Sequence, residues 1–83
     1  MPNEKKLMKC ADNITKLIGK YPSLRDFARN ITEDPSDICR WKSGALVIKP
    51  RAVISICRLH LEVKPCELNP FIFPSDLRFV FKK

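Results

Sequence analysis

The sequence predicts a mainly α-helical fold, a small domain of four to five helices followed by a C-terminal β-strand. Two patterns carry this prediction. Apolar residues recur three and four positions apart through most of the chain, as on one face of an α-helix. They alternate with polar residues only near the C-terminus, as in a strand. With 83 residues, 45% of them hydrophobic, the chain can build one small domain with a modest core.

The first predicted helix runs from Asn3 to Ile18. Its apolar residues form one stripe at helical spacing, and lysines occupy much of the remaining surface. Gly19 follows directly and suits the left-handed position that ends many helices. The residues of the apolar stripe are Leu7, Ala11, Ile14, Leu17 and Ile18.

The second predicted helix begins at Ser23, a preferred N-cap residue. Asp26 lies three positions on and completes a Ser-x-x-Asp variant of the capping box. A break at Thr32-Glu33-Asp34 ends this helix. The apolar residues that share one of its faces are Leu24, Phe27, Ala28 and Ile31.

The third predicted helix begins at Pro35, whose missing N–H costs nothing at the first helical position. Asp34 is its expected N-cap. Ile38 and Trp41 are three residues apart and are expected to pack back against the second helix. The residues left pointing away are Ser36, Cys39, Arg40 and Ser43. Two short helices with a sharp break between them are the arrangement of a helix-turn-helix, whose second helix enters the DNA major groove.

The remainder of the chain predicts a fourth helix from Pro50 to about Leu61 and a short helical turn from Pro65 to Leu68. Asn69-Pro70 then breaks the helix. The expected inward positions of the fourth helix are Val53, Ile56, Cys57 and His60 or Leu61. In the last segment, Leu77, Phe79 and Phe81 alternate with Arg78, Val80 and Lys82, which is a strand pattern.

The net charge of +7 favours a polyanionic partner, and nucleic acid is the commonest one, although solubility alone is the alternative explanation. Cys10, Cys39, Cys57 and Cys66 lack the close spacing of a zinc site, and His60 is not placed as a fourth ligand. We expect no metal and no cofactor. The N-terminus does not resemble a signal peptide, and no apolar run is long enough to span a membrane, so we expect a cytoplasmic protein with reduced thiols.

Several of these residues together resemble the helix-turn-helix of phage-type Cro and repressor proteins. Ala28, the break near Thr32, Ile38 and Trp41 follow that pattern, and residues 40–44 are similar to the "x-W-K-x-G" ending of the family. Further on, Ile48-Lys49-Pro50 and the segments 67–70 and 73–74 resemble the YdaS/Cro subgroup. The family's turn usually carries Gly, an apolar residue and then Ser or Thr, where this chain has Thr32, Glu33 and Asp34.

This resemblance implies a lambda-repressor-like fold with a DNA-binding domain at residues 1–74 and a C-terminal strand or arm at residues 75–83. It implies a sequence-specific regulator of phage or prophage type, a Cro-like repressor that binds a double-stranded DNA operator as a homodimer within the nucleoid. The alternative is an antitoxin-like module that binds a toxin-like protein, with DNA binding secondary. We find no pattern of catalytic residues and expect the protein not to be an enzyme.

The helix at about 35–43 supplies the expected DNA-reading residues, and positively charged residues near the ends of the two motif helices supply the expected phosphate contacts. An ordinary solvated helix face is the alternative explanation. The reading residues are Ser36, Asp37, Cys39, Arg40 and Ser43, and the phosphate contacts are Lys20, Arg25, Lys42 and Lys49.

The C-terminal strand allows two interpretations. It can cover the core of its own domain, or it can pair with the same strand of a second subunit and so remove an exposed edge. The residues expected to contribute to dimerisation are Leu77, Phe79, Val80 and Phe81.

Overall fold

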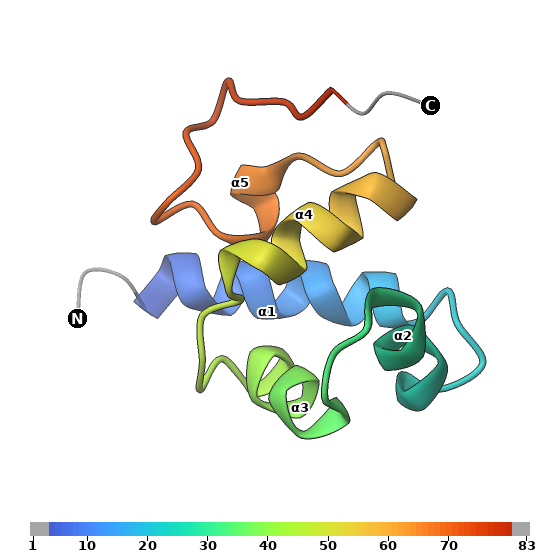
Figure 1. The fold of residues 1–83 in the computed structure, drawn as a ribbon. Coiled ribbons are helices and arrows are strands. Elements are labelled where there is room, and N and C mark those ends of the chain that lie inside the picture. Colours follow the sequence, from blue (N-terminus) through green and yellow to red (C-terminus); the bar gives the residue numbers. More distant parts are fainter. Residues whose placement is uncertain (1–3, 81–83) are drawn as a thin grey trace.

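The computed structural model describes residues 4–80 and contains five α-helices and no strand within that range. The helices are α1 (Glu4–Ile18), α2 (Leu24–Ile31), α3 (Pro35–Ser43), α4 (Pro50–Leu59) and α5 (Pro65–Leu68). Helix α1 crosses the middle of the molecule, with α4 and α5 on one side and α2 and α3 on the other (Figure 1). The prediction of a small, mainly helical domain is confirmed.

The core forms where α1 meets the other helices. Helix α1 packs against α3 and α5, and α4 packs against α5 and α2. Ile14 of α1 and Phe27 of α2 are fully buried, as is Ile56 of α4. Cys10 and Cys57 are buried as small apolar residues, and the inward position of Cys57 was predicted from the sequence. The amphipathic stripes read from the sequence therefore converge on one core.

The predicted helix starts are confirmed in atomic detail. The Ser23 hydroxyl accepts a hydrogen bond from the backbone N–H of Asp26 at 3.2 Å. The Asp34 carboxylate accepts from the backbone N–H of Ser36 at 2.8 Å, with Pro35 as the first helical residue. These bonds satisfy backbone donors that have no partner inside the helix. The first and last residues of α2 and α3 thus follow from side chains next to them in sequence.

The predicted C-terminal strand is wrong for the described residues, because 77–80 form no strand. Leu77 and Phe79 are instead half-buried and pack against the core. The rings of Phe73 and Phe79 meet edge to face, with centroids 5.5 Å apart. Val80 is 92% exposed, and Phe81 lies outside the described residues. A strand needs a neighbour to pair with, and no other extended segment of residues 4–80 provides one.

The fourth helix also ends earlier than predicted. It stops at Leu59, and the N–H of His60 donates to the carbonyl of Ile56 at 2.8 Å as the last helical bond. His60 then turns its ring towards Tyr21, with a hydrogen bond of 2.8 Å between Nε2 and the phenol oxygen. Leu61 is largely exposed. The apolar pattern in the sequence continues past Leu59, so it predicted a longer helix. The backbone leaves the helix at His60, where the side chain makes its polar contact with Tyr21.

Candidate nucleic-acid interface

Helices α2 and α3 contact each other and contribute to the same hydrophobic core. Ala28 of α2 is almost fully buried, as are Ile38 and Trp41 of α3. The two helices are in direct contact, and α3 also packs against α1. Helix α3 is therefore held on two sides by buried apolar residues, and its remaining face is free to meet solvent. The spacing of Ile38 and Trp41 predicted that these two residues face inward.

The turn between the two helices closes through a Schellman motif. The N–H of Glu33 donates to the carbonyl of Ala28 at 2.9 Å, and the N–H of Thr32 donates to that of Arg29 at 3.3 Å. Thr32 adopts the left-handed conformation, with φ of 57°. This conformation is unusual for a β-branched residue. The position where the resembling family often has glycine therefore carries threonine at a steric cost.

The end of α3 repeats the same motif with glycine. Ala45 donates to the carbonyl of Arg40 at 2.9 Å, and Gly44 donates to that of Trp41 at 3.2 Å. Gly44 has φ of 78°, and a Cβ placed on it would lie 3.3 Å from the sulfur of Met8. The backbone conformation favours glycine here, and a Cβ would also require the Met8 side chain to shift slightly.

The outward face of α3 carries most of the predicted reading residues. Ser36, Cys39 and Arg40 are exposed, and Asp37 is half-buried. The guanidinium of Arg40 lies 3.4 Å from the carboxylate of Asp37, and its side chain remains 62% exposed. The hydroxyl of Ser43 is exposed but donates to the carbonyl of Arg40 at 3.0 Å, so it helps to close the helix end. Arg40 is the longest polar group on this face.

The four predicted phosphate contacts differ in their surroundings. Arg25 and Lys42 are exposed, and neither forms an ion pair with any other described residue. Lys20 is exposed and lies 3.5 Å from the carboxylate of Glu62. Lys49 lies 2.7 Å from the carboxylate of Glu33, whose side chain is only 5% exposed. Arg25 and Lys42 are thus the cations with no competing acidic partner.

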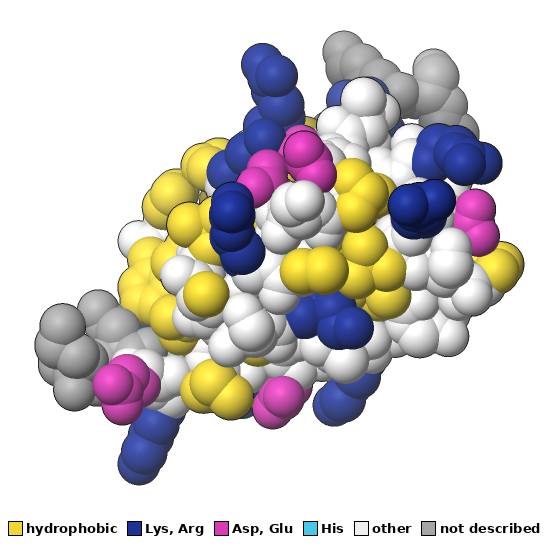
Figure 2. All heavy atoms as spheres, turned by 90° about the horizontal axis from the view of Figure 1, so that it is seen from below, with side chains coloured by type: hydrophobic (Ala, Val, Ile, Leu, Met, Phe, Trp, Pro, Cys, Tyr) yellow, Lys and Arg dark blue, Asp and Glu magenta, His cyan; other side chains and the backbone are white. Residues whose placement is uncertain are grey.

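Positive charge is spread over the molecule rather than gathered on α2 and α3. Between residues 23 and 49, basic residues outnumber acidic ones by one; the basic residues are Arg25, Arg29, Arg40, Lys42 and Lys49, and the acidic ones are Asp26, Glu33, Asp34 and Asp37. Figure 2 shows the face that carries these helices, with Lys and Arg side chains set among acidic and hydrophobic ones. The excess charge of the chain therefore lies mainly on other segments.

Two structurally important polar residues were not predicted from the sequence. Glu33 was interpreted only as part of the break that ends the second helix, yet its side chain is buried against Lys49. Asn69 was interpreted only as a helix breaker, yet it is fully buried. Its amide donates to the carbonyl of Ile48 at 2.7 Å and accepts from the N–H of Phe71 at 3.2 Å. No local signal marks the contact of Glu33 with Lys49 or that of Asn69 with Ile48, because these partners are distant in sequence.

Cys10, Cys57, Cys66 and a cavity beside α1 lie away from this face. The cavity, of about 380 Å³, opens between α1, α5 and the C-terminal segment and is lined in part by Cys10 and Cys66. Burial raises the pKa of the Cys10 thiol, and burial followed by the nearby charges of Glu67 and Cys66 raises the pKa of Cys57 to about 11. Both buried thiols therefore carry their protons at neutral pH and are poor nucleophiles.

Within residues 4–80 no group of three or more His, Cys, Asp or Glu side chains is placed to hold a metal ion. In the same range, no helix is both long and apolar enough to cross a membrane.

Comparison with known proteins gives no relative: no protein-family model, curated protein or solved structure matches this chain.

Proposed function

We propose that this protein is a sequence-specific, double-stranded DNA-binding transcription regulator that places α3 in the major groove. One observation carries the proposal. Ile38 and Trp41 are buried on one side of α3, and Ser36, Cys39 and Arg40 are exposed on the other. An α-helix fits the major groove, where each base pair presents a distinct set of donors and acceptors.

Arg40 is the proposed base-reading residue. A guanidinium can donate two hydrogen bonds to O6 and N7 of guanine, the commonest specific contact in such complexes. In the free protein Arg40 is paired with Asp37 through one ordinary 3.4 Å contact at the surface, which is a weak interaction. Breaking this ion pair to contact a base would therefore cost little free energy. Asp37 is then available to accept from a cytosine amine or to favour the start of α3.

Arg25 and Lys42 are the proposed phosphate contacts. Both are exposed cations, one in the first turn of α2 and one in the last turn of α3. Phosphate contacts of this kind set the register of a protein on DNA and supply much of its affinity, and they make that affinity depend on salt. Lys20 can join them if it leaves Glu62, since both partners of that pair are exposed.

We propose that the regulator acts as a repressor and binds as a homodimer. One recognition helix reads only a few base pairs, and a two-fold dimer places two such helices roughly 34 Å apart on a pseudo-palindromic operator. Leu77 and Phe79 already pack on their own core. Of the described residues predicted to contribute to dimerisation, the exposed Val80 is therefore the one that is available to a partner.

The test of the proposed function is binding to duplex DNA. A pool of random duplexes, selected over several rounds with the purified protein, should converge on a two-fold related sequence. Fluorescence anisotropy should then show an affinity whose logarithm falls linearly with the logarithm of salt concentration. The DNA upstream of the protein's own gene is the natural second substrate, and footprinting would locate the binding site on it. Failure to retain any duplex at low salt would refute the proposal.

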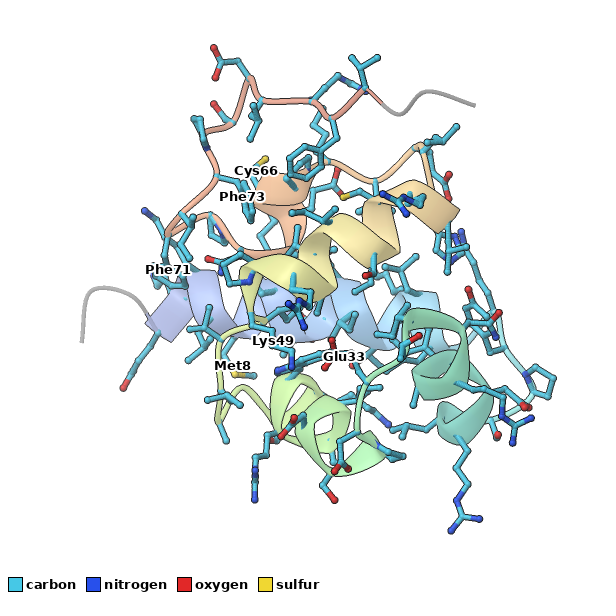
Figure 3. The ribbon with its side chains drawn as sticks, viewed as in Figure 1. Met8, Glu33, Lys49, Cys66, Phe71 and Phe73 are labelled. Atoms are coloured by element: carbon cyan, nitrogen blue, oxygen red, sulfur yellow. The ribbon has the colours of Figure 1, made fainter. Side chains whose placement is uncertain are left out.

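A second candidate function, an antitoxin-like protein-interaction module, is favoured by the exposed apolar residues Met8, Leu46, Val47, Phe71 and Ile72. Met8 and Phe71 lie at the same end of α1 (Figure 3). Co-purification of the product of a neighbouring gene tests this function. If Met8→Ser and Ile72→Ser abolish the complex and leave DNA affinity unchanged, this surface serves a protein partner; no stable complex would count against the module.

A further inference from the structure

Glu33 and Lys49 form the most buried ion pair among the described residues. The Lys49 ammonium lies 2.7 Å from a carboxylate oxygen of Glu33. The Glu33 side chain is 5% exposed and that of Lys49 is 49% exposed. Figure 3 shows the two side chains next to one another, between α3 and α4 in that view. The short distance and the low exposure of Glu33 make this a charge-assisted hydrogen bond rather than a loose surface contact.

The pair links the two segments that flank α3. Glu33 belongs to the turn that leads into α3, and Lys49 directly precedes Pro50 of α4. Lys49 is held by its backbone as well, since its carbonyl accepts from the N–H of Val53 at 3.1 Å. The neighbouring residue Ile48 is buried and hydrogen-bonded to Asn69. Both partners are therefore fixed by their surroundings, and the ammonium is directed towards Glu33.

The charge balance of the Glu33–Lys49 pair affects how the protein would bind DNA. A buried carboxylate is costly without a cation beside it, so Glu33 holds Lys49 strongly. The pair contributes no net charge to the region around α3, where each unpaired cation would bind phosphate. Lys49 has the position expected of a phosphate contact from the sequence. Its charge, however, is already neutralised within the protein.

We infer that Glu33 is a positioning residue that withholds Lys49 from the DNA backbone and so lowers the sequence-independent affinity of the protein. This inference rests on the proposed DNA-binding function. A phosphate contact from Lys49 would strengthen binding to every sequence alike. Genomic DNA offers a vast excess of non-specific sites, so a regulator gains when one such contact is removed.

The test compares Glu33→Gln with the wild-type protein on a duplex of unrelated sequence, by fluorescence anisotropy over a range of salt concentrations. Glutamine keeps the size of the side chain and removes its charge, which releases Lys49. We expect tighter non-specific binding at low salt and a salt dependence steeper by about 0.9, the value of one additional phosphate contact on duplex DNA. Circular dichroism establishes that each variant is folded at the temperature used.

Two further variants make the result specific to Lys49. Asp76→Asn adds the same unit of charge at an exposed position on the side of α1 away from α3, and it should leave the slope unchanged (Figure 1). The double variant Glu33→Gln/Lys49→Met removes both partners and should return the slope to the wild-type value. The double variant also serves if Glu33→Gln alone fails to fold, because it leaves no buried charge without a partner.

Three results would overturn the inference. An unchanged or shallower slope for Glu33→Gln would show that Lys49 is not released to the phosphates. A double variant with a slope about 0.9 below that of the wild type would show that Lys49 already contacts DNA. If the wild-type protein itself shows no salt-dependent binding, the proposed function fails, and this inference fails with it.

Discussion

The sequence predicts the structure of helices α2 and α3 much better than that of the C-terminal segment at residues 70–80. Helices α2 and α3 each start at a capping side chain and end at a residue in the left-handed conformation. In the C-terminal segment, an alternating apolar pattern predicts a strand that the described residues do not form. Caps act on the backbone next to them, whereas a strand exists only if another strand is present. Local signals are thus reliable where structure is local.

The strongest test of the α2–α3 packing is Trp41→Ala. Trp41 is almost fully buried between α3 and the rest of the core, so truncation leaves a large cavity. We expect a loss of about 3–5 kcal/mol in the free energy of unfolding, measured by urea denaturation. Val80→Ala is the matched control in the C-terminal segment, and its effect should be close to zero because Val80 is exposed. Equal unfolding midpoints for wild type and Trp41→Ala would contradict the packing.

Truncation after Ser75 tests the role of the C-terminal segment. It removes Leu77 and Phe79, which are half-buried on the core, so we expect a loss of roughly 1–3 kcal/mol in stability. Denaturation measures this loss, and analytical ultracentrifugation of both forms measures association. A truncated chain that keeps full stability but changes from dimer to monomer would show that the segment serves a partner subunit instead.

Thr32→Gly should stabilise the protein by about 0.5–1 kcal/mol. The left-handed conformation of Thr32 carries a steric cost that glycine avoids, and the flexibility of glycine in the unfolded chain offsets part of the gain. Gly44 closes α3 through the same hydrogen-bond pattern and shows that glycine fits this motif. Thermal denaturation measures the change. Thr32→Ala, which keeps a Cβ, should give little of it, and equal gains from both variants would assign the effect to something other than φ.

A further effect on stability appears only at alkaline pH. Burial raises the pKa of the Cys57 thiol from 9.0 to about 11, so the folded protein keeps this proton at pH values where the unfolded chain loses it. This contribution to stability is present below about pH 9 and is lost as the pH rises towards 11. Thermal denaturation from pH 8 to 11 should show a decline that is shallower for Cys57→Val. The exposed Cys39→Ser variant is the control and should follow the wild type.

The limits of sequence interpretation are clearest at particular residues. Ser23, Asp34 and Pro35 reveal the helix starts, because each acts on its own neighbours. The contact between Glu33 and Lys49 could not be predicted, since it joins two loops that meet only in the folded chain. The hydrogen bond from Asn69 to the carbonyl of Ile48 could not be predicted for the same reason. In the candidate interface the sequence separates the buried side of α3 from its exposed side, but it does not show which cations are already paired.

The measurement that most directly tests the central claim compares Arg40→Ala with Arg29→Ala in DNA binding. The two arginines are alike: each is exposed and faces an aspartate three residues earlier, Asp37 on α3 and Asp26 on α2. On a selected operator, Arg40→Ala should weaken specific binding by about 1–3 kcal/mol, or roughly 5- to 150-fold, and relax the preference at one base pair. Arg29→Ala should not change that preference. Equal losses on specific and unrelated duplexes for Arg40→Ala would assign it to a phosphate and would contradict base reading by this residue of α3.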